Sequence, residues 1–215
     1  MSTRRKWFQA TGADGRDMAP DLLRFAEMIG LERIASGRYS ILLLLGLFGG
    51  THSGKLNPAK VIHEIESLEG IREKSNLKPT SQFERRPALR GLWHKHYLGD
   101  GLPSMAKNLR KGIGRYGLPW LKQQVAEAHL SGEERFLTEQ DCARIAHDAV
   151  VENWQRLIEH SALTGEWLIF AKHQGKNFYL CLGQHTSGDE MLRAQIDAVC
   201  FKEFPFLAKI LTQNA

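Results

Sequence analysis

A pair of apolar segments near the C-terminus constrains the fold of this 215-residue chain more than any other feature. Residues 167–172 and 178–182 are apolar apart from Lys172, and Gln174-Gly175 lies between them, a pattern typical of a β-hairpin. Both segments are apolar on both faces, so we expect other elements to cover the hairpin on each side. Because two strands alone are only marginally stable, we also expect a third strand before residue 100.

Most of the remaining chain shows helical spacing of its apolar residues, notably at residues 21–34, 41–48, 119–130 and 138–160. Helix-start signals precede three of the predicted helices, at Asn57-Pro58, at Thr138 with Asp141, and at Ser187 with Glu190. The predicted fold class is therefore α+β: mostly helical, with about six helices and a small antiparallel sheet built on the 167–182 hairpin.

The sequence contains neither an internal repeat nor a linker rich in proline, glycine and serine. We therefore predict a loosely held N-terminal segment over residues 1–19 and a single globular domain over residues 20–215.

The longest apolar stretch, residues 41–48, is far shorter than the roughly 20 residues that a membrane-spanning helix needs. The basic N-terminus has no apolar stretch behind it of the kind that a signal peptide requires. The three cysteines, Cys142, Cys181 and Cys200, lack metal-ligand spacing and are predicted to be reduced core residues. We expect a cytoplasmic protein with no membrane association, no metal and no cofactor.

Positive charge is concentrated in the central segment, residues 76–122. This segment holds ten lysines and arginines but only two acidic residues, Glu84 and Asp100, so its net charge is +8. Because the whole chain carries +5, the remainder is net −3. Such an asymmetry indicates an anionic partner.

The same segment contains a candidate site for nucleic acid. On a strand, His94 and His96 would share one face about 7 Å apart, where they could act as general base and general acid in metal-independent phosphodiester cleavage. The predicted phosphate-binding residues are Arg90, Lys95, Lys107, Arg110 and Lys111. Trp93 and Tyr97 are predicted to stack on bases, as aromatic residues do in proteins that bind single strands or RNA.

Other interpretations stay open at this point. His94 and His96 are also explained as surface residues of a solvated patch, and whether the chain is an enzyme is undecided. The basic segment could instead dock an acidic protein partner in a non-enzymatic interaction protein, or belong to a small-molecule hydrolase. A phosphate-loop-like pattern at residues 49–55 lacks the hydroxyl residue after its lysine, because position 56 is leucine; we interpret it as a connection between helices.

Overall fold

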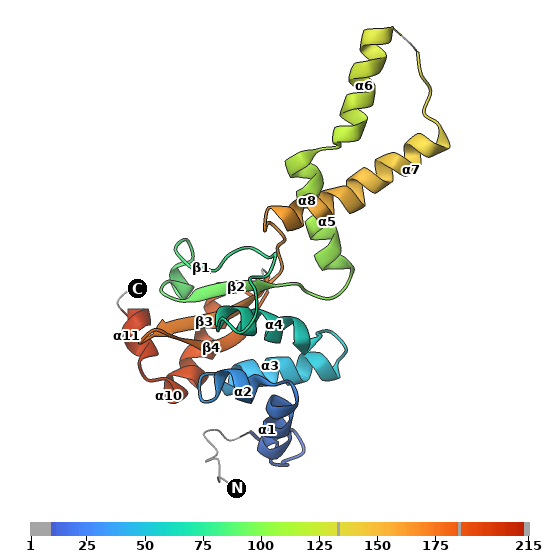
Figure 1. Ribbon diagram of the computed structural model, residues 1–215. Helices are drawn as coiled ribbons and strands as arrows, with labels where there is room; N and C mark the ends of the chain where they lie inside the picture. The colour runs from blue at the N-terminus through green and yellow to red at the C-terminus, as the bar shows by residue number, and fades with distance from the viewer. Residues whose placement is uncertain (1–9, 133, 185, 213–215) are drawn as a thin grey trace. The chain divides into compact units, whose positions relative to one another are not determined.

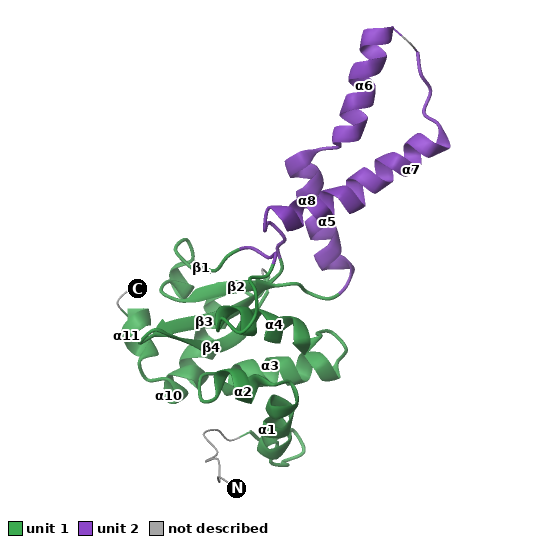
Figure 2. Ribbon diagram, in the orientation of Figure 1, with its two compact units in different colours: residues 1–75, 79–100, 165–215 green, residues 76–78, 101–164 purple. Residues whose placement is uncertain are grey.

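The computed structural model describes residues 10–132, 134–184 and 186–212. The chain divides into two compact units, shown in Figure 2: unit 1 is residues 1–75, 79–100 and 165–215, and unit 2 is residues 76–78 and 101–164. The predicted single domain over residues 20–215 therefore contains residues of both units.

Part of the predicted loose N-terminal segment, residues 1–9, lies outside the described residues. Residues 10–18 form a small loop in which Thr11 and Asp17 make an isolated antiparallel bridge and the backbone N–H of Met18 donates to the carbonyl oxygen of Ala10 at 2.8 Å.

Unit 1 contains one antiparallel sheet and two groups of helices. Its helices before the sheet are α1 (Ala19–Met28), α2 (Leu31–Ala35), α3 (Ile41–His52) and α4 (Pro58–Leu68). Its strands are β1 (Ser81–Gln82), β2 (Trp93–Tyr97), β3 (Glu166–His173) and β4 (Lys176–Gly183), with the 3₁₀ turn η1 (Pro87–Leu89) between the first two. The C-terminal helices are α9 (Asp189–Gln195), the π-helical η3 (Ile196–Cys200), α10 (Phe201–Glu203) and α11 (Leu207–Thr212).

The sheet has the strand order β1-β2-β3-β4 (Figure 1), with every neighbouring pair antiparallel. Strands β3 and β4 are the predicted hairpin. Gln174 and Gly175 join them with φ angles of 49° and 75°, and positive φ at both central residues is what a type I′ turn requires. Strand β2 supplies the third strand predicted before residue 100.

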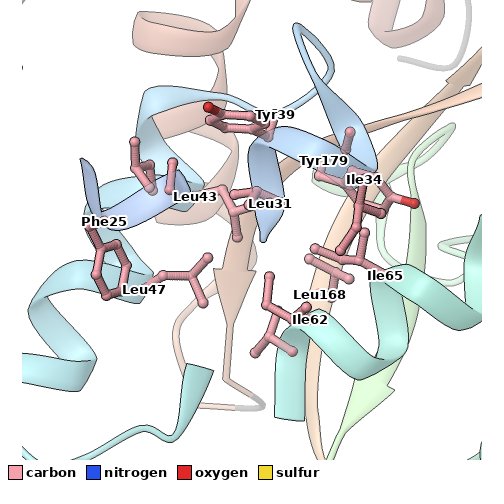
Figure 3. Packing of buried hydrophobic residues seen from close by; sticks show 14 of the residues in the cluster. Phe25, Leu31, Ile34, Tyr39, Leu43, Leu47, Ile62, Ile65, Leu168 and Tyr179 are labelled. Carbon is pink, nitrogen blue, oxygen red and sulfur yellow. The ribbon is translucent and has the colours of Figure 1, made fainter. Parts of the chain in front are cut away.

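Side chains from both faces of β3 are buried, which confirms that the hairpin is covered on each side. Leu168 and Phe170 join the core cluster formed with α1 to α4, and Figure 3 shows Leu168 among the side chains of that cluster. Trp167, Ile169 and Ala171 point to the opposite face and pack with residues of α9, η3, α10 and α11. Alternate residues of one strand thus serve two separate cores.

Two helices before the sheet differ in extent from their predictions. The helix predicted over residues 21–34 is interrupted at Gly30, whose φ of 78° is left-handed, so two helices, α1 and α2, replace one. Helix α3 begins where the Ser40 hydroxyl accepts a hydrogen bond from the N–H of Leu43 and continues past the predicted end at residue 48 to His52. The phosphate-loop-like pattern therefore begins inside a helix.

Two further predictions, one about Ser187 and one about Cys142, were wrong. Ser187 does not cap α9, because the residue before that helix is Gly188, and the Ser187 hydroxyl instead accepts from the N–H of Gln184 at 3.0 Å. Cys142 is exposed rather than part of the core, whereas Cys181 and Cys200 are buried and free, as predicted.

Unit 2 is helical throughout its regular structure. Its elements are α5 (Leu102–Tyr116), α6 (Pro119–Ser131), α7 (Glu139–His147), the π-helical η2 (Asp148–Glu152) and α8 (Asn153–Glu159). The predicted capping box is confirmed at the start of α7: the Thr138 hydroxyl accepts from the N–H of Asp141, and the Asp141 carboxylate accepts from the N–H of Thr138.

The α+β class with a small antiparallel sheet is confirmed, and the described residues form more helices than the six expected. None of the described helices combines the length and the apolar character needed to cross a membrane.

Candidate nucleic-acid interface

The predicted site residues are divided between the two units. Six of them, Arg90, Trp93, His94, Lys95, His96 and Tyr97, belong to unit 1, and three, Lys107, Arg110 and Lys111, belong to unit 2. The continuous basic segment in the sequence is therefore two separate sets of side chains.

His94 and His96 lie on one face of β2, as alternate residues of a strand must, with ring centroids 5.4 Å apart. The face they share is the one covered by the C-terminal helices, because their partners across the β2–β3 pair are Ile169 and Trp167. The His94 ring stacks on Phe83 with centroids 4.4 Å apart. The two imidazoles are neighbours within a packed aromatic cluster.

His96 is only 4% exposed. Its Nδ1 lies 2.8 Å from the backbone carbonyl oxygen of Gly165 and 3.3 Å from the Gly165 nitrogen. Gly165 in turn lies against β2, since a Cβ atom there would be 1.8 Å from the carbonyl oxygen of Tyr97. This geometry makes His96 a link between β2 and the start of β3.

Lys95 points to the opposite face of β2 and is buried. Its Nζ lies 3.4 Å from Oε2 of Glu64, which is also buried and accepts a hydrogen bond from the Ser75 hydroxyl at 2.7 Å. Burial lowers the pKa of the Lys95 ammonium, and the Glu64 carboxylate opposes that shift. The contacts of Lys95 join β2 to α4.

The remaining predicted residues of unit 1 differ in exposure. Tyr97 is buried, and burial raises the pKa of its hydroxyl. Trp93 is half-buried and lies under the Lys172 ammonium, whose Nζ is 3.8 Å from the ring centroid. Arg90, which follows the short turn η1, is exposed.

Helix α5 of unit 2 presents the other three predicted residues. Lys107 and Arg110 are exposed, and Lys111 is half-buried. Asn108 fixes the helix, because its side chain donates to the carbonyl oxygen of Thr164 at 2.8 Å and accepts from the Thr164 N–H at 2.9 Å. Four basic residues and no acidic residue lie between positions 102 and 116.

Lys111 is the centre of a cluster of three cations. Its ammonium donates to the carbonyl oxygen of Ala162, and Arg115 is one helical turn further along α5. Lys78 lies nearby because its N–H donates to the carbonyl oxygen of Leu163 at 3.2 Å. Burial, and then the charges of Lys78 and Arg115, lower the pKa of Lys111 to about 8.

Two members of this cluster are absent from the predicted phosphate-binding set. Arg115 could have been found from its i, i+4 spacing to Lys111 on one helix. Lys78 could not, because a parallel bridge between Leu77 and Leu163 carries it there from a distant part of the chain.

Metal ligands do not converge in the part of the chain that the structure describes: no group of three or more histidine, cysteine, aspartate or glutamate side chains there could hold a metal ion.

Comparison with protein-family models, with curated proteins and with solved structures finds no match to this chain. The site is therefore interpreted from its own geometry.

Proposed function

We propose that this protein binds nucleic acid, RNA or single-stranded DNA in preference to duplex, through the basic face of unit 2. This face consists of Lys78, Lys107, Arg110, Lys111 and Arg115. The observation that carries the proposal is the clustering of Lys78 and Arg115 around Lys111, where burial first, and then the charges of these two residues, lower the pKa of the Lys111 ammonium. A phosphate group placed there would relieve this repulsion and would gain charge-assisted hydrogen bonds.

An aromatic ring lies beside the cations. Tyr116 is half-buried, the Arg115 guanidinium carbon lies 5.4 Å from its ring centroid, and its hydroxyl donates to the carbonyl oxygen of Arg156 at 3.3 Å. Stacking on rings beside arginine is how sequence-tolerant proteins hold unpaired bases, which favours single strands over duplex.

The proposal does not extend to strand cleavage. The nuclease chemistry at His94 and His96 stays a prediction, and the burial of His96 against Gly165 gives it no support, because a general acid or base must reach the substrate. Tyr97 is also buried, so its ring gives no support to the predicted base stacking.

The test is binding of a labelled single-stranded oligonucleotide, measured by fluorescence anisotropy over a range of salt concentrations. We expect affinity to fall as salt rises, because bound phosphates release counterions. The triple variant Lys107→Gln, Arg110→Gln, Arg115→Gln should bind at least about tenfold more weakly. The slope of log affinity against log salt concentration should also become shallower, by roughly 0.7 for each phosphate that the variant no longer neutralises.

The matched control removes the same charge elsewhere. Lys122, Lys176 and Lys209 are exposed and lie outside the basic face, so their replacement by glutamine should change affinity little. No binding at low salt, or equal weakening in the two triple variants, would contradict the proposal. A discrete complex with an acidic protein that survives nuclease treatment would favour the interaction-protein alternative instead.

A further inference from the structure

The cation cluster of unit 2, defined as Lys78, Lys111 and Arg115, comes from two distant parts of the chain. Lys111 and Arg115 lie one turn apart on α5. Lys78 follows Leu77, which bridges Leu163 in the segment after α8. All of these residues belong to unit 2 (Figure 2), so the cluster is built within one compact unit.

The cation cluster is not paired with carboxylates as other cations of unit 2 are. Three arginines elsewhere in the unit each face a carboxylate at 2.7 to 2.9 Å, in the pairs Arg135–Asp141, Arg144–Glu152 and Arg156–Asp148. Within the part of the chain that the structure describes, neither Lys111 nor Arg115 forms an ion pair, and the charges that shift the pKa of Lys111 are both positive. The cluster can therefore accept negative charge from another molecule.

The cluster also keeps hydrogen-bond donors for such a molecule. An ammonium group has three N–H donors and a guanidinium has five. Lys111 donates to the carbonyl oxygen of Ala162, and the described residues provide no further acceptor for the side chain of Lys111 or of Arg115. The helix dipole favours a cation such as Arg115 in the last turn of α5, but it does not explain Lys78, which lies outside the helix.

Three clustered cations fit a terminal phosphate better than an internal one. An internal phosphodiester carries a single negative charge and has two non-bridging oxygens. A phosphomonoester carries about −1.5 to −2 at pH 7 and has three strong acceptor oxygens. The number of cations in the cluster matches the oxygens of the monoester, and its charge compensates more of theirs.

Aromatic rings lie beside the cluster. The Arg115 guanidinium carbon is 5.4 Å from the ring centroid of Tyr116, and that centroid is 5.7 Å from the centroid of the exposed His160 ring. Arg115 therefore belongs both to the cation cluster and to an aromatic group. A base next to a bound phosphate could stack there, whereas inorganic phosphate would leave the rings unused.

We propose that the cation cluster binds the terminal phosphomonoester of a single-stranded nucleic acid, with the adjoining base against Tyr116 and His160. This inference rests on the proposed function and adds to it a preference for phosphorylated ends. Lys107, one turn before Lys111 and about 6 Å away along the helix axis, would hold an internal phosphate. A 5′-phosphate and a 3′-phosphate share this chemistry, and the experiment distinguishes them.

The experiment measures the affinity of the full chain for four internally labelled single-stranded oligonucleotides by fluorescence anisotropy. One has hydroxyl groups at both ends, one has a 5′-phosphate, one has a 3′-phosphate, and one has hydroxyl ends but is one nucleotide longer. We expect one of the two phosphorylated strands to bind at least about tenfold more tightly than the first strand, through added charge-assisted hydrogen bonds. The longer strand, which adds an internal phosphate, should gain much less.

Variants then locate the preference. Lys111→Gln and Arg115→Gln should each bring the affinity ratio between the phosphorylated and the hydroxyl-ended strand close to one. Lys107→Gln should weaken binding of both strands alike and preserve the ratio. Lys122→Gln, at an exposed site on α6, should change neither affinity, and unchanged circular dichroism shows that each variant is folded.

The outcomes separate this inference from the proposed function. Salt-dependent binding that ignores the terminal phosphate, or favours it no more than the longer strand, would overturn the inference and leave the proposed function standing. A preference that persists in both folded variants, Lys111→Gln and Arg115→Gln, would also overturn it. Absence of binding to all four strands at low salt would overturn both.

Discussion

At the scale of single residues, burial decides which charged groups are available for function. Lys95 and His96 lie in the middle of the basic segment, yet both are buried, Lys95 in contact with Glu64 and His96 in contact with Gly165. Lys111 is only half-buried, and it lies beside two other cations of unit 2. Two lysines of the same basic segment, Lys95 and Lys111, thus differ in how accessible the fold leaves them.

Glu203 gives a residue-scale prediction about pH. Its carboxylate accepts from the N–H of Ile41 at the start of α3, at 3.1 and 3.3 Å, and burial raises its pKa to about 7. The folded state therefore holds this proton more tightly than the unfolded state, so Glu203 makes stability fall as pH rises from about 4.5 to about 7.

We expect Glu203→Gln to reduce that fall in stability, because a neutral side chain can still accept from Ile41 without titrating. Urea denaturation at a series of pH values measures it, with Glu190→Gln, an exposed carboxylate, as the control. An unchanged pH dependence in Glu203→Gln would contradict the assignment.

At the scale of elements, a capping pair in the sequence predicted the start of a helix correctly only where its side chain bonds to the helix backbone. Thr138 with Asp141 and Ser187 with Glu190 show the same spacing, yet only the first pair forms a capping box. Ser187 binds the N–H of Gln184 in the preceding turn instead, because serine hydroxyls compete for nearby backbone groups in turns.

The two sites predict different effects of removing the hydroxyl. Thr138→Ala should lower the local stability of α7 by about 1 kcal/mol, the usual effect of removing a cap. Ser187→Ala should change the stability of α9 much less. Hydrogen exchange of the amides in each helix measures both, and equal effects would show that the capping contact contributes nothing.

At the scale of the whole molecule, the buried cores lie in unit 1, where both faces of the sheet are covered. Unit 2 is held by a few side-chain contacts, such as the Arg156 guanidinium with buried Asp148 at 2.9 Å and the Asn153 amide with the Gly117 carbonyl at 2.9 Å. Regions with few buried apolar contacts open at lower free energy.

We therefore expect amides of α6 to exchange with solvent much faster than amides of β3 when the protein is dilute. Hydrogen exchange followed by mass spectrometry on peptides from both elements tests this. Equal protection of α6 and β3 in dilute protein would contradict the assignment of stability to unit 1.

The sequence by itself determined the hairpin at residues 167–182, the burial of both its faces and the start of α7, because spacing over a few residues encodes each of them. The tertiary structure decided the rest. It placed His96 against Gly165, brought Lys78 beside Lys111 through the Leu77–Leu163 bridge, and left α6 uncovered. These contacts join residues far apart in the chain, and no local pattern of side chains specifies which distant backbone a residue will meet.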